Sequence, residues 1–231
     1  MIEFINVTKK YNDLKALDSI NLQIKLGEMM FIMGQSGAGK STILKLLYRE
    51  EKPTSGQLLV SNVDVGTLPH SQTPVLRRKM GIIFQDFKLL PSKTSFENIA
   101  YPLHAIGMDV WEIKKRVHGA LKVVGLSNKA DEFPKNLSGG EQQRVGIARA
   151  IVQGPSILIA DEPTGNLDPS TSLEIFQLLE KINQRGTTIL VATHNQYIAK
   201  QMNKRVITIN QGKIISDSTI DNTPQRVEFQ Q

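Results

Sequence analysis

The sequence predicts an α/β fold, formed as one domain over residues 1–231. Short continuous apolar runs bounded by turn residues are typical of buried parallel strands, and four occur, at 29–33, 82–84, 157–160 and 189–192. Segments with helical periodicity lie between these runs. Strands that alternate with helices along a chain indicate an α/β core.

The N-terminal part has a different strand pattern. Residues 2–7 and 20–24 alternate apolar with polar side chains, which predicts half-buried strands, and residues 58–60 are expected to form a partner strand. We therefore expect the core to comprise residues 1–90 and 155–220, with a polar tail at 221–231.

Helical patterns without a strand pattern fill residues 91–154, so we expect a helical subdomain inserted into the core. Within it, residues 111–124 place apolar side chains on one helix face and lysine and arginine on the other. A later helix is expected to begin at Pro169, because proline favours the first helical position, and to end before Gly186.

Composition narrows the class of protein. The chain has no cysteine, which excludes disulfides and thiolate metal sites and favours a cytosolic protein. It begins without a secretion signal and has no apolar run long enough to span a membrane, so we expect any membrane contact to be peripheral. The formal charge of +6 suits nucleic acid or an anionic membrane face, yet a mildly basic surface is commonly a solubility feature.

A glycine-rich motif directly follows the first apolar run. Residues 34–42 satisfy G-x-x-x-x-G-K-[ST] and precede a helical run, and a plain turn would need neither the lysine nor the hydroxyl. Glycines let backbone N–H groups curl around a phosphate, and the helix start adds partial positive charge. We expect Lys40 to neutralise the β- and γ-phosphates of ATP and Ser41 to contact Mg²⁺. The predicted ATP-binding residues here are Gly34, Gln35, Ser36, Gly37, Ala38, Gly39, Lys40, Ser41 and Thr42.

Two acids end the apolar run at 157–160, at the sheet edge where open α/β folds bind their ligands. Because consecutive side chains of an extended chain point opposite ways, the two carboxylates can have separate roles. We expect Asp161 to hold Mg²⁺ through water and Glu162 to act as general base toward an attacking water. Acids at strand ends are often only turn formers, but the glycine-rich loop favours the catalytic interpretation.

A third motif, residues 137–144, places a serine and two glycines directly before a helix. It resembles a second phosphate-binding helix start. A capping box between Ser138 and Glu141 would account for those two residues, but not for the glycine pair or for Gln142 and Gln143.

The order and spacing of these motifs resemble those of the ABC ATPases, from Ile2 to about Ser216. The resemblance implies a P-loop NTPase core of ABC type, with an N-terminal antiparallel β subdomain and an inserted helical subdomain. It also implies that Tyr11 stacks on adenine, that Gln85 reaches the metal and senses a membrane partner, and that His194 contacts the γ-phosphate. The implied catalytic residues are Glu162, His194 and Gln85, and the implied metal-binding residues are Ser41, Gln85 and Asp161.

The resemblance further implies a homodimer in the ATP-bound state. Two chains of this family sandwich ATP head to tail, so the signature of one chain serves the nucleotide held by the other. Residues 166–168 match the loop that crosses that interface. The residues expected to act in trans are Ser138, Gly139, Gly140 and Asp168.

Stretches outside the shared motifs, at 48–56, 84–91 and 165–169, are similar to those of bacterial cell-division ATPases of the family. This implies an integral membrane partner, a place at the cytoplasmic face of the inner membrane, and activation of cell-wall hydrolases. The loop at 166–168 also occurs in lipoprotein-releasing and macrolide-export ATPases, which stay the alternative. Asn195 stands where an aspartate commonly follows the switch histidine, and residues 222–231 match nothing.

Two other classes are less well supported. ABC proteins that act on DNA or ribosomes generally carry coiled-coil insertions or a second ABC domain, and this chain has neither, so no nucleic acid is expected. An ATP-binding clamp that barely hydrolyses would not need Glu162 and His194, which are both present. Apolar residues follow Gln85 at 87, 89 and 90, and they either form a groove for an amphipathic helix of the partner or pack into the core.

Overall fold

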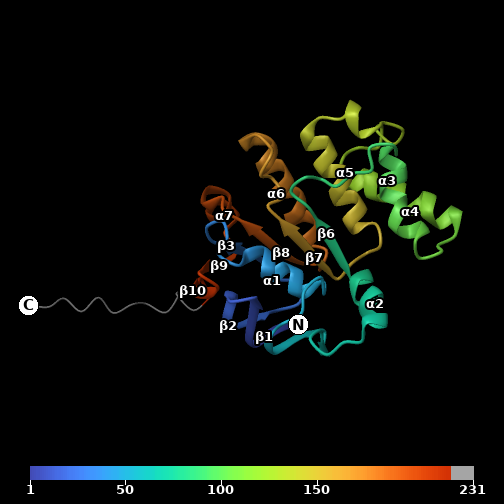
Figure 1. The fold of residues 1–231 in the computed structure, drawn as a ribbon. Helices are drawn as coiled ribbons and strands as arrows, with labels where there is room; N and C mark the ends of the chain where they lie inside the picture. Colours follow the sequence, from blue (N-terminus) through green and yellow to red (C-terminus); the bar gives the residue numbers. More distant parts are fainter. Residues whose placement is uncertain (220–231) are drawn as a thin grey trace, which may run out of the picture.

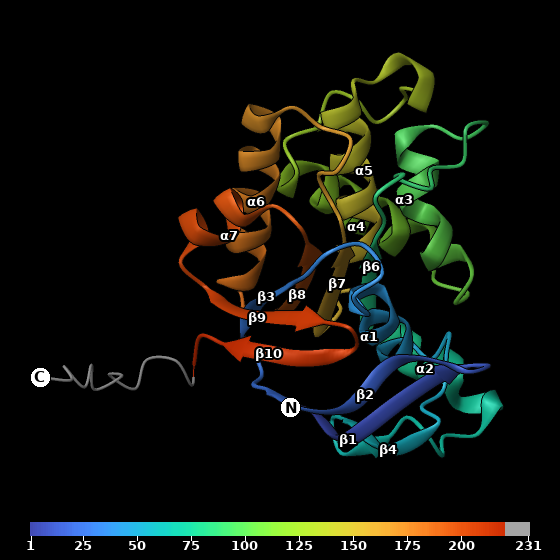
Figure 2. The ribbon, with the colours of Figure 1, turned by 60° about the vertical axis from the view of Figure 1, so that its left-hand side comes forward.

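The computed structural model describes residues 1–219, so the predicted polar tail lies outside the described residues. Strands and helices alternate along most of this part, as the sequence predicts (Figure 1). Figure 2 shows the N-terminal strands at one end of the molecule and helices α3 and α4 at the other. The α/β fold with an N-terminal antiparallel sheet and a helical insertion is confirmed, whereas the domain boundaries stay a prediction.

The N-terminal sheet is antiparallel and has the strand order β2-β1-β4-β5. The expected strands at 2–7, 20–24 and 58–60 are all present, and each extends further than the sequence pattern indicated. The bounds are β1 Ile2–Tyr11, β2 Leu14–Ile24, β4 Ser55–Val60 and β5 Val63–Asp64.

The larger sheet has the order β10-β9-β3-β8-β7-β6 and is parallel except for β10. Its four predicted strands are confirmed, because continuous apolar runs suit strands buried on both faces. Strands β9 and β10 were not predicted from the sequence. The bounds are β3 Met29–Met33, β6 Met80–Ile83, β7 Ile157–Asp161, β8 Thr188–Thr193, β9 Arg205–Asn210 and β10 Lys213–Asp217.

Helices cover the larger sheet and fill the insertion between β6 and β7. The helices expected to follow the glycine-rich loop and to begin at Pro169 are present as α1 and α6. Three helices, α3 to α5, lie together in the insertion (Figure 1). The bounds are α1 Lys40–Leu47, α2 Thr73–Arg78, α3 Ser95–His104, α4 Val110–Val123, α5 Gly139–Ile151, α6 Pro169–Asn183 and α7 Gln196–Met202.

The central strand β3 separates two hydrophobic cores. Phe31 packs with the core formed by helices α3 to α6, whereas Met30 and Ile32 pack with the core shared by α1 and the N-terminal sheet. Successive side chains of a strand point to opposite faces, so one strand serves both cores. The loop that leaves β3 is therefore anchored from both sides.

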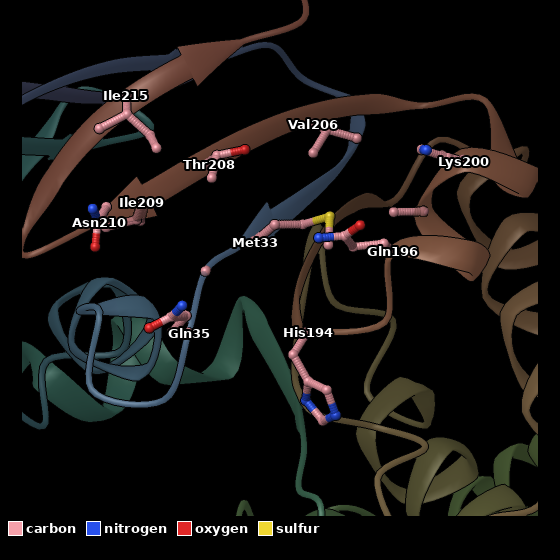
Figure 3. A pocket seen from close by; sticks show the side chains of 12 residues that line it. Met33, Gln35, His194, Gln196, Lys200, Val206, Thr208, Ile209, Asn210 and Ile215 are labelled. Atoms are coloured by element: carbon pink, nitrogen blue, oxygen red, sulfur yellow. The ribbon is translucent and has the colours of Figure 1, made fainter.

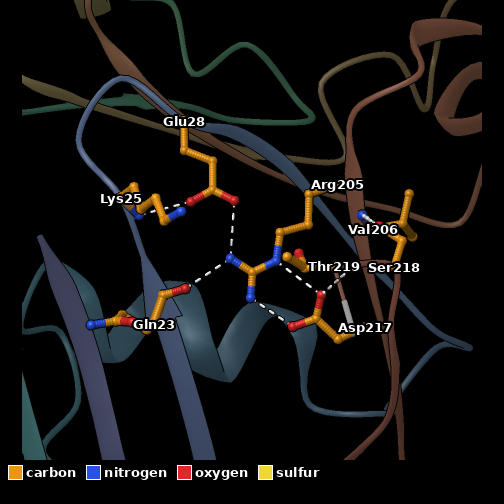
Figure 4. Close-up of polar contacts among 8 residues, drawn as sticks. All are labelled: Gln23, Lys25, Glu28, Arg205, Val206, Asp217, Ser218 and Thr219. Carbon is orange, nitrogen blue, oxygen red and sulfur yellow. Dashed lines mark hydrogen bonds and ion pairs between the residues drawn. The ribbon is translucent and has the colours of Figure 1, made fainter. Parts of the chain in front are cut away.

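Arg205 at the start of β9 joins the two sheets (Figure 4). Its guanidinium donates to the Asp217 carboxylate of β10 at 2.9 and 2.6 Å and to Glu28 at 2.9 Å. It also donates to the backbone carbonyl of Gln23, on β2 of the N-terminal sheet, at 2.8 Å. One side chain thus ties segments that lie 182 residues apart in sequence.

No helix among residues 1–219 has both the length and the apolar character that a membrane span needs.

Candidate functional site

The predicted motifs meet at the carboxyl ends of three neighbouring strands, β3, β8 and β7. The glycine-rich loop follows β3, His194 follows β8, and Asp161 ends β7. Adjacent strands are spaced by about 4.8 Å, so three of them span about 10 Å, which suits a triphosphate chain. A cavity of about 990 Å³ lies over this edge, and its walls include Lys40, Ser41, Gln85, Asp161, Glu162 and His194.

The glycine-rich loop is held close to other backbone segments. A Cβ atom at Gly34 would lie 2.3 Å from the Ile209 carbonyl oxygen, and one at Gly39 would lie 2.7 Å from that of Ala16. Gly39 caps α1 with a positive φ of 113° and offers no side chain to the first N–H groups of the helix. These N–H groups therefore remain free to donate to an anion, so the loop fits a phosphate.

Lys40 is almost fully buried, with 7% of its surface exposed. Its Nζ atom donates to the carbonyl oxygens of Gly34 and Gln35 at 2.8 and 3.1 Å, and lies 3.8 Å from Oε1 of Glu162. The ammonium group is thus positioned between the loop and the carboxylate, inside the cavity that would hold the phosphates.

Asp161 and Glu162 have different surroundings. The Ser41 hydroxyl donates to Oδ1 of Asp161 at 3.2 Å, and burial raises the pKa of the Asp161 carboxyl. Glu162 instead contacts His194, with 3.0 Å between Oε1 of Glu162 and Nδ1 of His194.

The expectation that an extended backbone separates the two carboxylates is wrong at Glu162. This residue has a left-handed backbone, with a φ of 46°, and its N–H donates to the Ala192 carbonyl at 2.9 Å. The chain leaves β7 in a turn, and this turn directs the Glu162 side chain toward Lys40 and His194.

His194 lies directly after β8 with its side chain 71% exposed. Its backbone N–H approaches Oε2 of Glu162 at 3.4 Å. The following residue, Asn195, caps α7 by accepting the N–H of Ile198 at 3.1 Å. Asparagine and aspartate are about equally effective caps, so the asparagine at 195 is compatible with the same local structure.

Gln85 follows β6 and lines the same cavity as Ser41 and Asp161. A Cβ atom at Gly165 would lie 2.9 Å from its Nε2 atom, so the glycine leaves room for the amide. No group of three or more His, Cys, Asp or Glu side chains within residues 1–219 is arranged to hold a metal. The three predicted metal ligands supply one carboxylate, one hydroxyl and one amide, which suits Mg²⁺ only if phosphate oxygens and water complete its shell.

Gly34 and Ala38 are not in the cavity wall, which the other predicted residues of the glycine-rich loop line. Tyr11 also lies outside this wall. Its ring lies beneath Lys9, whose Nζ is 4.8 Å from the ring centroid, so adenine stacking on Tyr11 stays a prediction. The wall instead includes residues that sequence reasoning missed, and these come from the start of β2 and from the β9–β10 turn: Leu14, Lys15, Ala16, Gln211 and Gly212. No local sequence pattern indicates these residues, because only the folding of the chain brings these segments next to the predicted motifs.

The signature segment lies apart from this cavity, at the start of α5. Ser138 and Glu141 form a capping box, with Oγ of Ser138 accepting the Glu141 N–H at 3.2 Å and Glu141 accepting the Ser138 N–H at 2.8 Å. The two glutamines hold the helix start in place. Gln142 donates to the Leu137 carbonyl, and the buried Gln143 donates to the carbonyl of Pro163, next to Glu162.

The glycine pair brings the signature segment against the loop before α6 and the first turn of that helix. A Cβ atom at Gly139 would lie 3.2 Å from Leu167, and one at Gly140 would lie 2.6 Å from Thr171. Asp168 caps α6 by accepting the Thr171 N–H at 2.9 Å, and hydrogen bonds, chiefly from Ser170, lower the pKa of its carboxyl. The four residues predicted to act in trans therefore belong to two segments that touch each other.

The loop after Gln85 packs partly against the rest of the protein, and the groove for a partner helix stays a prediction. Leu89 packs against the core of the helical insertion, whereas Phe87 is half-buried with its ring near Gly139. The Arg149 guanidinium donates to the carbonyls of Phe87 and Lys88 at 2.8 and 2.7 Å, which fixes the loop to α5.

A second cavity of about 560 Å³ borders the first and shares Gln35 and His194 with it (Figure 3). Its other walls come from the C-terminal strands and from α7, including Val206, Ile209 and Gln196. Gln35 and His194 therefore lie at the boundary between the two cavities.

Comparisons with known proteins agree with this geometry. The family described as ABC transporter matches residues 17–165. The cell division ATP-binding protein FtsE of Bacillus subtilis is 54% identical over 220 residues, covering 95% of this chain and 96% of the relative. The protein of the same name from Escherichia coli is 46% identical and covers 93% and 97%.

Solved structures show the same fold. A dimeric ATP-binding cassette, bound to ADP and phosphate in a post-hydrolysis state, is 39% identical with a TM-score of 0.84 and covers 94% of this chain and 97% of its own. A cassette from Clostridium perfringens, part of an ABC transporter complex, is 32% identical with a TM-score of 0.89 and covers 96% and 90%.

Proposed function

The chain belongs to the ABC transporter family, among relatives named FtsE, and from this premise we propose that it is the ATPase subunit of an FtsE–FtsX-type cell-division complex. ATP binding and hydrolysis follow from the family. The proposal adds an integral membrane partner resembling FtsX, a peripheral place at the cytoplasmic face of the bacterial inner membrane, and activation of cell-wall hydrolases. The relatives named FtsE support cell division over the lipoprotein-releasing or macrolide-export alternative.

The observation that carries the catalytic proposal is the position of Glu162 between Lys40 and His194. A water placed beside the Glu162 carboxylate can give up a proton to it while the water oxygen attacks the γ-phosphorus. The bond from that phosphorus to the bridging oxygen of ADP then breaks, and ADP and phosphate leave. Lys40 stabilises the charge that develops on the phosphate oxygens.

Mg²⁺, when bound, supplies a Lewis acid that neutralises phosphate charge. Ser41, Asp161 and Gln85 are the residues that would hold it, since all three line the same cavity and each carries a side-chain oxygen. Partial burial raises the pKa of the Asp161 carboxyl, and a cation bound beside this carboxylate would lower that pKa again.

We also propose that ATP joins two copies of the chain. The signature segment and Asp168 lie outside the cavity of their own chain and are partly exposed, so a second copy can place them against the nucleotide. The dimeric cassettes among the solved structures support this arrangement.

Two variants test the site. Lys40→Ala should abolish tight ATP binding, whereas Glu162→Gln should retain binding and lose about 10²–10⁴-fold in turnover, because only the base is removed. Phosphate release and nucleotide affinity are measured with and without co-purified FtsX. Equal ATP affinity in Lys40→Ala, or unchanged turnover in Glu162→Gln, would overturn the assignment, and failure of FtsX to co-purify with the wild type would remove the cell-division proposal.

A further inference from the structure

Two large apolar side chains at the start of α4 are left in solvent. Trp111 is 82% exposed and Val110 is 71% exposed, which places both among the three most exposed large apolar residues of the described chain, together with Tyr197 at 72%. Tyr101 and Ile106, on the segment that leads into α4, are 59% and 37% exposed. Figure 1 shows α4 on the outer edge of the molecule, on the side away from the C-terminal strands. Neither core of the protein uses these side chains.

The same helix carries a basic stripe. Lys114, Lys115 and Lys122 follow Trp111 at spacings of three, four and eleven residues, so all four project from one face of the helix. Buried residues such as Ile113 and Val117 occupy the opposite face.

The positive charge of the stripe is not neutralised within the described chain. Lys114, Lys115 and Lys122 form no ion pair among residues 1–219. The one acid inside α4, Glu112, is bound to Arg116 at 2.7 Å beside the stripe.

We propose that this face of α4 is a lipid-binding surface, which rests on the anionic headgroups of a membrane with Trp111 and Val110 inserted at the interface. Tryptophan favours the membrane–water boundary, and lysines near an anionic leaflet are attracted to it. An aliphatic side chain beside the tryptophan suits the acyl boundary, whereas a nucleic-acid backbone would leave Val110 in water. This contact goes beyond the proposed docking to a membrane protein, and it does not depend on ATP hydrolysis.

Trp111 reports directly on this proposal, because the chain has a single tryptophan. The full-length chain is mixed with vesicles of phosphatidylglycerol and phosphatidylcholine, or of phosphatidylcholine alone, and the emission of Trp111 is recorded. We expect a shift to shorter wavelength with the anionic vesicles only, weakened by salt. An unchanged emission maximum, or an equal shift with neutral vesicles, would overturn the proposal.

Two double variants distinguish binding by the lysines of α4 from a general attraction between a basic protein and anionic vesicles. Lys114→Ala combined with Lys115→Ala should weaken binding to anionic vesicles about 25-fold, since each lysine contributes about fivefold. The matched control is Lys25→Ala combined with Lys181→Ala, two exposed lysines outside α4 without ion pairs in the described chain, and it should bind almost as the wild type does. Equal losses in both double variants would contradict a specific surface.

Trp111→Ala, followed by vesicle co-sedimentation, should lose most binding while ATP affinity stays unchanged. A Trp111 shift that appears only in vesicles containing the membrane partner would assign this face to protein contact and overturn lipid binding. The proposed ATPase function is tested separately by phosphate release, so a failure of lipid binding can be distinguished from a failure of the ATPase proposal.

Discussion

Replacing Arg205 with alanine should destabilise the protein strongly. The Arg205 side chain is 16% exposed and its main partner, Asp217, is 9% exposed, so the substitution leaves a largely buried carboxylate without its counter-charge. Breaking a fully buried pair costs about 3–5 kcal/mol, and partial exposure of Glu28 places this case near the lower end, at about 3 kcal/mol. For a chain of this size the melting temperature should fall by roughly 6–12 °C.

The loss should depend on pH. The hydrogen bond from Arg205 holds the pKa of the Asp217 carboxyl below its ordinary value of 3.8. Between the folded-state pKa and the ordinary pKa of 3.8, the unfolded chain binds more protons than the folded chain. The stabilisation from this carboxylate is therefore fully present above pH 3.8 and is lost as the pH falls through the lower, folded-state pKa. In Arg205→Ala this acid-side loss should be smaller, because the partner that depresses the pKa is gone.

Urea denaturation followed by far-UV circular dichroism at pH 7 and near pH 3 measures both effects. Lys204→Ala is the matched control, since it breaks the neighbouring pair with Glu180, whose side chains are 29% and 30% exposed, and it should cost at most about 1 kcal/mol. A cost below 1 kcal/mol for Arg205→Ala, or a cost equal to that of the control, would refute the reasoning.

Two further predictions concern the helical insertion. Gly140→Ala should cost about 1–3 kcal/mol, because its new methyl group would meet that of Thr171 at 2.6 Å, and adding Thr171→Ser should recover part of the loss in thermal melts. If the second substitution restores nothing, the contact is not the cause. Phe87→Ala should reduce co-purification with FtsX while ATP binding and the melt stay normal. Normal co-purification by Phe87→Ala would exclude the loop from the interface with FtsX. Leu89→Ser should instead lower the melting temperature, because Leu89 packs against the core.

The sequence predicted best where the physical signal is local. Strand β3 was predicted at its observed bounds, because a continuous apolar run between turn residues has few other structures. The glycine-rich loop was located for the same reason, since its motif combines backbone freedom, a cation and a hydroxyl over nine residues.

Features that depend on distant contacts were not predictable. The pair Gly139 and Gly140 is explained by Leu167 and Thr171, which lie about thirty residues away, and no local pattern indicates that contact. Strands β9 and β10 lack a continuous apolar run because they are only partly buried. The cavity wall from the β9–β10 turn was missed with them. The left-handed backbone at Glu162 likewise follows from the turn that the fold imposes after β7.

The strand order of the larger sheet determines when the nucleotide loop can form during protein synthesis. Within residues 1–219, strand β3 pairs in this sheet only with β8 and β9, which comprise Thr188–Thr193 and Arg205–Asn210. In a nascent chain that ends before residue 188, the glycine-rich loop has therefore been synthesised, but strand β3, which precedes it, has no strand to pair with. Because contacts so distant in sequence close late, the ATP site should be acquired after most of the chain has left the ribosome, as one of the final steps of folding.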